Sequence, residues 1–370
     1  MANHIGERVR LTVFGQSHAP AIGAVIEGLP PGLRVDWDGV QSWLDRRAPG
    51  RNALSTSRRE ADIPRVLSGL NASGETCGAP LAVMIENTDA RSSDYNSIIE
   101  NRVPRPGHAD YPAWAKYGAA HDPRGGGMFS GRLTAPLVIA GAVAAQVLSR
   151  DHGVATGVRI AECAGIGDRP RKVDPVDRAI LAKLAGQAFP VLDDSVGERM
   201  RSAILEASAA RDSVGGVVEA YAVGVPPGWG EPMFGGLENR IAQVVFGVPA
   251  VRGIAFGAGD GSGFAAAGLR GSGHNDAFYL DDDGRVRTRT NRHGGILGGI
   301  STGMPIVFEA AFKPTPTIGI RQDTVELNRN APATLNGSGR HDPCVAQRAA
   351  PVVEAALAFA LLDASLVGKY

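Results

Sequence analysis

The sequence contains little cysteine and little lysine, and it has no excess of charge. The three cysteines, Cys77, Cys163 and Cys344, lie far apart along the chain and fit neither a disulfide framework nor a paired-cysteine metal site. We therefore expect reduced thiols, as in cytosolic proteins. The 38 basic and 38 acidic side chains give a formal net charge of zero. This balance provides no general attraction to nucleic acid or to a membrane surface.

The sequence also lacks a clear export signal or membrane span. The N-terminal string MANHIGERVRL is polar and has no apolar signal core. The most apolar run starts at Leu133, is shorter than the ~20 residues of a span, and contains Pro136 and Gln146. It predicts a buried helix with Thr134 as N-cap and Gly153 just beyond its end. We expect a soluble, cytoplasmic protein.

Familiar nucleotide and metal motifs are missing as well. The string GAGDGSG at 257–263 lacks the spacing and the following helix of a dinucleotide fingerprint, and there is no P-loop. His341 and Cys344 stand close enough to share a metal ion, but no second pair supports a zinc site. We expect no metal.

Glycine and proline, with 49 and 24 residues, are plentiful, and 44% hydrophobic content suffices for a large core. Residue patterns predict strands at 9–15, 21–30, 215–226, 250–259 and 304–314, and helices at 37–47, 133–150, 176–187, 195–210, 236–245 and 345–364. The elements alternate without regular βαβ spacing, which favours an α+β fold with layered sheets. Without a repeat or a linker, we expect a single domain over 1–370.

Two histidines stand in open loops. In RPGHADYPAWAKYG, at 105–118, the Pro-Gly pair breaks any preceding helix, so a turn presents His108 between Arg105 and Asp110. In GQSHAP, His18 lies between two predicted strands. Each histidine is either a proton donor aimed at a charged ligand or an ordinary loop residue, and these strings alone leave both interpretations open.

An arginine-rich loop, DRRAPGRNALSTSRREAD, holds Arg46, Arg47, Arg51, Arg58 and Arg59 within a short window. Guanidinium groups suit bidentate binding of phosphate and carboxylate. A solvated charged surface is the alternative interpretation.

The string DPRGGGMFSGR places three consecutive glycines after Arg124. Glycine lets the backbone approach a ligand closely, and successive N–H groups can cradle an anion. Ser130 and Arg132 follow, just before the N-terminus of the predicted apolar helix, which adds positive potential.

Three C-terminal strings complete the polar loops. NRHGGILGGISTG contains Gly298 in a pair of glycines that permits close backbone approach. FKPTPT supplies Lys313, Thr315 and Thr317 on a proline-stiffened segment that could hold a phosphate. In GRHDPC, Asp342 is either a proton relay or an ordinary turn residue.

Together and in this order, these strings resemble the chorismate synthase family from about residue 6 to about residue 365. The resemblance rests most specifically on RPGHADY and GRHDPC. It implies a β-α-β sandwich fold. It also implies an enzyme that converts 5-enolpyruvylshikimate 3-phosphate to chorismate by 1,4-anti elimination of phosphate. The family requires reduced FMN although the reaction has no net redox change.

The resemblance further implies an external flavin reductase or other reductant, an association with NADP, and a homotetramer. It implies three catalytic residues: His18 on the departing phosphate, His108 keeping the reduced flavin protonated, and Asp342 assisting removal of the ring proton. Substrate-binding residues would be Arg47, Arg51, Arg58 and Arg132. FMN contacts would be Met128, Phe129, Ser130, Pro249, Ala250, Gly298, Lys313, Pro314, Thr315, Pro316, Thr317 and Arg340.

Five positions depart from the family pattern: Gln16, Ala19, Ala53, Met128 and Leu133. Met128 and Ala53 stand where family members usually carry basic residues. These two departures motivate an alternative in which a related flavin enzyme acts on a different phosphorylated acid.

Overall fold

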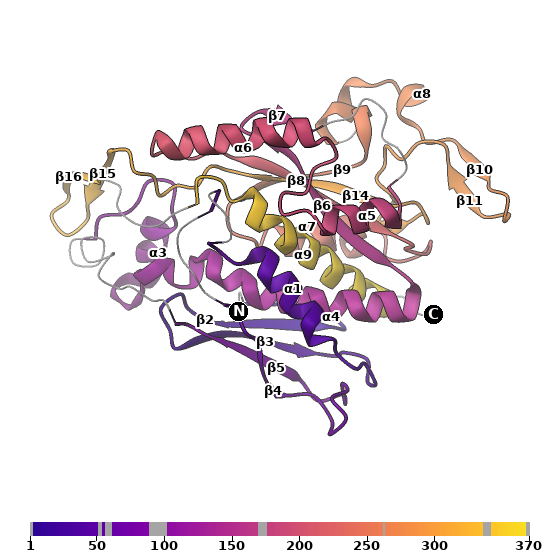
Figure 1. Ribbon diagram of the computed structural model, residues 1–370, viewed down its shortest axis with the longest axis horizontal. Helices are drawn as coiled ribbons and strands as arrows, with labels where there is room; N and C mark the ends of the chain where they lie inside the picture. Colours follow the sequence, from indigo (N-terminus) through magenta and orange to yellow (C-terminus); the bar gives the residue numbers. More distant parts are fainter. Residues whose placement is uncertain are drawn as a thin grey trace.

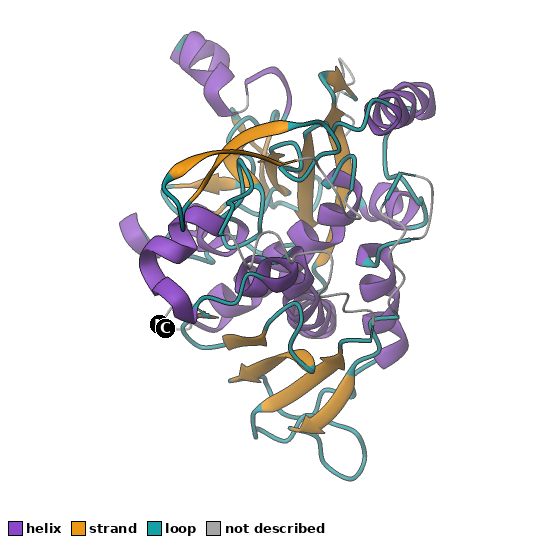
Figure 2. Cartoon of the chain, turned by 90° about the vertical axis from the view of Figure 1, so that its left-hand side faces the viewer, coloured by secondary structure: helices purple, strands orange, loops and turns teal. Residues whose placement is uncertain are grey.

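A computed structural model describes residues 3–50, 54–55, 61–88, 102–168, 176–261, 263–335 and 342–367. Two five-stranded sheets enclose a layer of helices (Figure 1). Figure 2 shows the same arrangement from the side, with strands above and below a central group of helices. The expected α+β fold, a β-α-β sandwich, is confirmed by this arrangement.

The first sheet is antiparallel and has the strand order β1-β2-β3-β5-β4. Its strands are, in sheet order, β1 His4–Ile5, β2 Arg10–Gly15, β3 Ala21–Glu27, β5 Leu81–Glu86 and β4 Arg65–Ser68. The second sheet, also antiparallel, has the order β7-β6-β8-β14-β9. Its strands are β7 Ile166–Gly167, β6 Ala155–Cys163, β8 Gly216–Val223, β14 Ile306–Phe312 and β9 Val251–Phe256.

Helices fill the space between the sheets and cover the second one. The central helices are α1 Trp37–Arg47, α4 Thr134–His152, α7 Leu237–Val245 and α9 Ala346–Val367, whereas α5 Arg178–Ala185 and α6 Asp194–Ala209 pack on β6 of the second sheet. Smaller elements are the helices α3 Asp110–Tyr117 and α8 Gly271–His274, and the hairpins β10–β11 (Phe278–Leu280, Val286–Thr288), β12–β13 (Ile296–Leu297, Ile300–Ser301) and β15–β16 (Gln322–Glu326, Ala331–Leu335).

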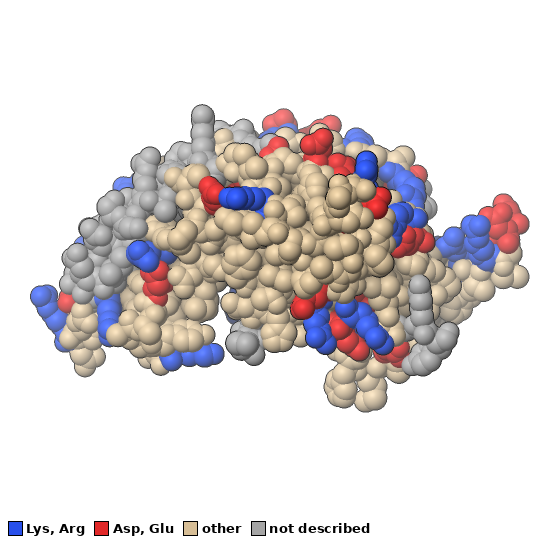
Figure 3. Space-filling view, turned by 90° about the horizontal axis from the view of Figure 1, so that it is seen from below, with Lys and Arg blue, Asp and Glu red and all other residues tan. Residues whose placement is uncertain are grey.

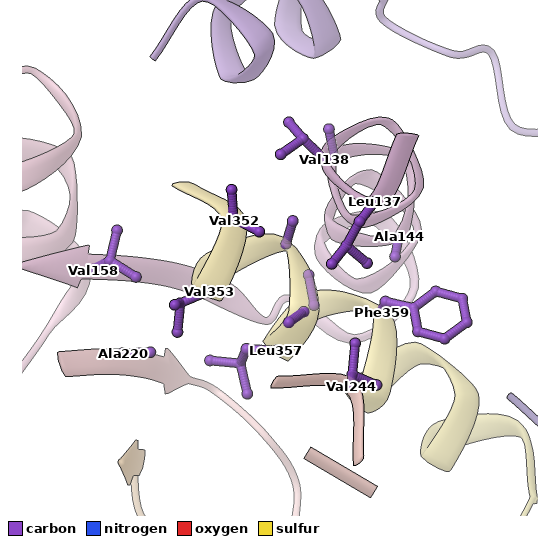
Figure 4. Packing of buried hydrophobic residues seen from close by; sticks show 14 of the residues in the cluster. Leu137, Val138, Ala144, Val158, Ala220, Val244, Val352, Val353, Leu357 and Phe359 are labelled. Carbon is purple, nitrogen blue, oxygen red and sulfur yellow. The ribbon is translucent and has the colours of Figure 1, made fainter. Parts of the chain in front are cut away.

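Helices α4 and α9 form the centre of the core (Figure 4). Both are apolar around most of their circumference, as expected of helices buried on all sides. A Cβ built on Gly141 of α4 would lie 2.3 Å from the Ala355 Cα of α9, so only glycine allows the two backbones to approach this closely. The stretches Arg124–His152 and Ala346–Val367 are long and apolar enough for a membrane, but 72% and 89% of an apolar 18-residue window in each are buried inside the protein.

Two acids interrupt the apolar surface of α9, and each has a partner. Glu354 pairs with Arg46 of α1 at 2.8 Å. The Asp363 carboxylate accepts the backbone N–H groups of three consecutive residues, Glu7 to Val9, at 2.7–3.1 Å. Burying a carboxylate is costly unless it is paired and hydrogen-bonded, so these contacts explain how both acids fit inside the core.

The predicted helices all occur, and the five predicted strands correspond to β2, β3, β8, β9 and β14. The predicted cap was wrong: α4 starts at Thr134 itself, whose hydroxyl donates to the Gly131 carbonyl instead of capping the helix. Gly153 does end α4, in the left-handed conformation with φ +64°. Strands β4, β5 and β6 and helix α3 were not predicted.

Candidate active site

The three glycines of the RGGG string form an irregular turn between two of the predicted catalytic histidines. Gly125, Gly126 and Gly127 have φ values of +59°, +87° and +54°, which side-chain-bearing residues rarely adopt. A Cβ on Gly125 would lie 2.6 Å from the His18 Nε2, and a Cβ on Gly126 would lie 3.4 Å from the His108 Nε2. The turn therefore brings together histidines that are 90 residues apart in the sequence.

The His18 loop is fixed from both sides. The Asn87 side-chain amide donates to the carbonyls of Gln16 and Ala19, at 3.1 and 2.7 Å. The Ser17 backbone N–H donates to the Gly127 carbonyl at 3.2 Å. The Ser17 hydroxyl is buried and has no hydrogen-bond partner among the described residues, which is unusual for a native protein and is typical of a site that receives a ligand.

His108 belongs to a cluster with Arg105 and Asp110. Its Nδ1 lies 2.8 Å from the Asp110 carboxylate, which also accepts hydrogen bonds from Arg105. Burial raises the pKa of Asp110, but hydrogen bonds from Arg105 and His108 lower it more, so this pKa lies well below its usual value. Asp110 is therefore an anion at neutral pH, although its exposed fraction is only 1%.

Two of the predicted substrate-binding arginines converge on a carboxylate that sequence analysis missed. The Asp62 carboxylate pairs with Arg47 at 2.5 Å and with Arg132 through its other oxygen. Burial raises the pKa of Asp62, but the two guanidinium groups lower it further than burial raises it. Burial also lowers the pKa of Arg47 to about 10. Two cations thus share the Asp62 anion.

Asp342 lies next to this arginine cluster. Its carboxylate accepts a hydrogen bond from Arg348 at 2.5 Å, and Arg348 also donates to the Arg47 carbonyl at 3.0 Å. Arg47 in turn donates to the Gly131 carbonyl at 3.3 Å. This chain of contacts connects the third predicted catalytic residue to the loop that follows the three glycines.

A cavity of about 310 Å³ lies against the same loop, and Met128, Ser130 and Pro249 line it together with the C-terminal half of α7. Cavities of at least about 300 Å³ are typical of small-molecule sites. Phe129, between two of these lining residues in sequence, packs edge-on against His121, with ring centroids 6.0 Å apart. Three predicted cofactor residues therefore share one cavity, and a fourth lies beside it in the chain.

The KPTPT segment lies beside the His108 turn. Lys313 donates from its ammonium group to the Gly107 carbonyl and from its backbone N–H to the Ala250 carbonyl, the latter at 3.0 Å. A Cβ on Gly107 would lie 3.1 Å from Pro316. The Thr315 hydroxyl is buried without a hydrogen-bond partner among the described residues. The neighbours Pro314 and Thr317 belong to the same segment.

Some predicted residues lie elsewhere or are not described. Gly298 forms the turn between β12 and β13, beside the N-terminus of α7, whereas the cavity lies against the other end of that helix. Arg51, Arg58 and Arg340 lie outside the described residues. Within the described part of the chain, no three His, Cys, Asp or Glu side chains are grouped as a metal site.

His121 is a further residue that sequence analysis missed. It lies beside Gly127, where a Cβ would be 3.9 Å from its ring, so three imidazoles surround the three glycines. Its Nδ1 is buried and has no hydrogen-bond partner among the described residues. Burial lowers the pKa of His121. The sequence signal that could have identified His121 was its position close to the RGGG string.

Comparison with known proteins agrees with the architecture and the site. The family model described as chorismate synthase matches residues 9–366. Chorismate synthase of Methanothermobacter thermautotrophicus is 45% identical over 98% of this chain and 93% of its own length, and that of Synechocystis is 43% identical over 98% and 97%. A solved structure, "Crystal Structure of Chorismate Synthase", matches with a TM-score of 0.72 and 26% identity over 99% of this chain and 95% of that one.

These matches first define the class: the protein is a carbon–oxygen lyase. The chain belongs to the chorismate synthase family, whose reaction is part of the shikimate pathway. The alternative of a related enzyme with a different phosphorylated substrate is not favoured, because the compared relatives carry the same name.

Proposed function

We propose that this protein converts 5-enolpyruvylshikimate 3-phosphate to chorismate by 1,4-anti elimination of phosphate, with reduced FMN bound beside the substrate. The observation that carries this proposal is the position of His18 and His108 at adjacent glycines of one turn. Eliminating phosphate requires charge neutralisation at the leaving oxygens and an acceptor for a ring hydrogen. Two imidazoles beside a cationic cluster can meet these needs.

The residues present fit a flavin with a phosphate group. Lys313 supplies a cation, and the buried Thr315 hydroxyl, which has no hydrogen-bond partner among the described residues, could bond to a ligand oxygen. Met128, Ser130 and Pro249 line a cavity that offers both apolar and polar atoms to a ring system. Ala250 adopts φ +73°, a strained conformation typical of ligand-contacting backbone. When bound, the reduced flavin would supply an electron-rich ring that supports the elimination without net oxidation.

The arginine cluster would hold the anionic groups of the substrate. Arg47 and Arg132 both pair with the carboxylate of Asp62, and the Arg47 Nε has no acceptor among the described residues. Guanidinium groups suit phosphate or carboxylate. Arg51 and Arg58 would add to it from the same loop of the sequence.

The histidines and Asp342 would handle protons. His18 would bind the departing phosphate and give it a proton. His108 would hold a proton at its Nε2, the ring nitrogen that lies toward Gly126. Asp342, held by Arg348, would help to accept the proton that leaves the ring.

We also propose the remaining properties that the family resemblance implies. The chain would act as a single catalytic domain over residues 1–370, in the cytoplasm. An external reductase or another reductant, with NADP as the associated nucleotide, would keep the flavin reduced.

A homotetramer is part of the same proposal, and the outer surface of the first sheet supports it. Phe14, Val25, Ala82 and Met84 point to that side and are only partly covered within one chain. Seen from below, the side on which this sheet lies, the surface has a broad central area without charged side chains (Figure 3). An apolar sheet surface of this kind is typical of contacts between subunits.

The test is an anaerobic assay with dithionite-reduced FMN and 5-enolpyruvylshikimate 3-phosphate. We expect equal amounts of phosphate and chorismate. His18→Ala and His108→Ala should each lower turnover by ~10²–10⁴-fold if each acts in proton transfer. Flavin binding without any turnover would refute the proposed reaction, and losses below threefold in both variants would refute the two assigned roles.

A further inference from the structure

We propose that Asp110 is a positioning residue that makes Nε2 the proton-exchanging nitrogen of His108. This inference rests on the proposed function, because it concerns the proton that His108 handles. Asp110 is the first residue of α3, and both of its carboxylate oxygens are engaged. Oδ2 accepts from the Arg105 Nε at 2.8 Å and from the Arg105 backbone N–H at 3.0 Å.

The other oxygen of Asp110 determines the state of the imidazole. Oδ1 lies 2.8 Å from the His108 Nδ1, and it also accepts from the Arg105 Nη2 at 2.9 Å. An ionised carboxylate can only accept hydrogen bonds, so Nδ1 must carry a hydrogen. In the neutral ring, Nε2 is then the free base, and it is also the nitrogen that lies toward Gly126 and the glycine turn. A proton can therefore be gained or lost only at Nε2.

Arg105 places a cation against the same ring, opposite in sign to the Asp110 carboxylate. The Arg105 Nη2 lies 3.1 Å from Nδ1 and 3.3 Å from Nε2, so the guanidinium lies against the ring and does not select one nitrogen. A nearby cation disfavours the imidazolium, whereas the Asp110 anion favours it. Among the described residues, Lys313, at the Gly107 carbonyl, and His121 also lie near this turn.

Neutralising Asp110 should therefore change the tautomer of His108. In Asp110→Asn, the Nδ1 hydrogen is no longer required, and the ion pair between Arg105 and Asp110 is lost. We expect turnover to fall by ~10²-fold, in the range found for groups that orient a histidine, with KM changed by less than about threefold.

The decisive measurement uses the full-length enzyme without ligand. Histidine side-chain ¹⁵N NMR should show the His108 Nδ1 protonated and the Nε2 unprotonated in the neutral wild-type ring. Asp110→Asn should give a mixture of tautomers for this ring. Asp110→Glu, which keeps the anion, should restore part of the turnover and the original tautomer.

A matched control separates positioning from loss of structure. Asp363→Asn removes another buried carboxylate, which accepts backbone N–H groups near the N-terminus, and it should lower stability while leaving the His108 resonances and the pH profile unchanged. Two results would overturn the inference. One is an Nε2–H tautomer in the wild-type protein, and the other is an Asp110→Asn variant with the same turnover, pH profile and tautomer as the wild type. If Asp110→Asn does not fold, the wild-type tautomer and Asp110→Glu still decide it. Failure of the wild-type enzyme to convert the substrate would instead refute the proposed function, and the tautomer would remain measurable.

Discussion

Replacing Gly125 by alanine tests the geometry of the histidine-lined turn most directly. The residue has φ +59°, and a non-glycine residue in this conformation costs roughly 1–2 kcal/mol of stability. The new Cβ would lie 2.5 Å from the Ser17 hydroxyl and 2.6 Å from the His18 Nε2. Since non-bonded heavy atoms normally lie about 3.5 Å or more apart, the imidazole must shift by about 1 Å.

A shift of that size should affect catalysis more than stability. Misplacement of a reacting group by ~1 Å can cost ~10²-fold in rate. We therefore expect Gly125→Ala to lower kcat by about 10²-fold and the free energy of unfolding by about 1–2 kcal/mol. Turnover with reduced FMN and urea denaturation measure the two effects on the same preparation.

Variants at two other glycines separate the energetic cost of the backbone conformation from the effect of the contact with His18. Gly126→Ala has the same kind of backbone cost, at φ +87°, but its Cβ would meet the His108 Nε2 at 3.4 Å, an ordinary contact. Gly284→Ala, at φ +72°, has no atom within 4 Å and lies in the β10–β11 turn. Both should lose similar stability, with less than a tenfold loss of kcat for Gly126→Ala and none for Gly284→Ala. Equal losses of kcat in all three variants would refute the reasoning.

Three further changes test other parts of the structure. Asp62→Asn leaves two buried guanidinium groups without their anion and should lower the free energy of unfolding by about 3–5 kcal/mol in urea titrations; a loss below about 1 kcal/mol would contradict the buried cluster. Because burial lowers the pKa of His121 below its ordinary 6.5, its folded form binds a proton less readily than the unfolded chain, so the stability it contributes is complete above pH 6.5 and is lost as the pH falls below this value. His121→Gln should therefore lose less stability than the wild type between about pH 8 and pH 5.5, and equal losses would contradict this. A thiol reagent should label only Cys77 in the native protein and also Cys163 and Cys344 after unfolding; rapid native labelling of all three would contradict their burial.

Local patterns predicted the helices well because the signals lie within a few neighbouring residues. The apolar run from Leu133 predicted α4, and Gly153 ends it as expected, because a left-handed terminal residue favours glycine whatever surrounds it. The turn before α3 was also predictable, since the Pro-Gly pair allows few alternatives. The family resemblance could also be seen without a structure, because it rests on short strings and on their order along the chain.

Contacts between residues that are distant in the sequence could not be predicted from local patterns. Cys163 and Cys344, separated by 181 positions, lie with their sulfur atoms 3.5 Å apart. Asp62 ends the arginine-rich string, but the string does not indicate that Arg47 and Arg132 would share it, because that choice depends on how α1 packs against the start of α4. Strand β6 went unpredicted because it pairs with β8 and is buried on both sides, which removes the alternation typical of strands.

The sequence alone determined which local elements form and which residue types are available for chemistry, because propensity and turn conformation depend on near neighbours. Only the tertiary structure decided that Gly125, Gly126 and Gly127 would each lie beside a different imidazole. Packing of the two sheets on α4 and α9 fixes those distances. Burial then makes the hydrogen-bond partners of each charged group, and so its protonation, a property of the whole fold.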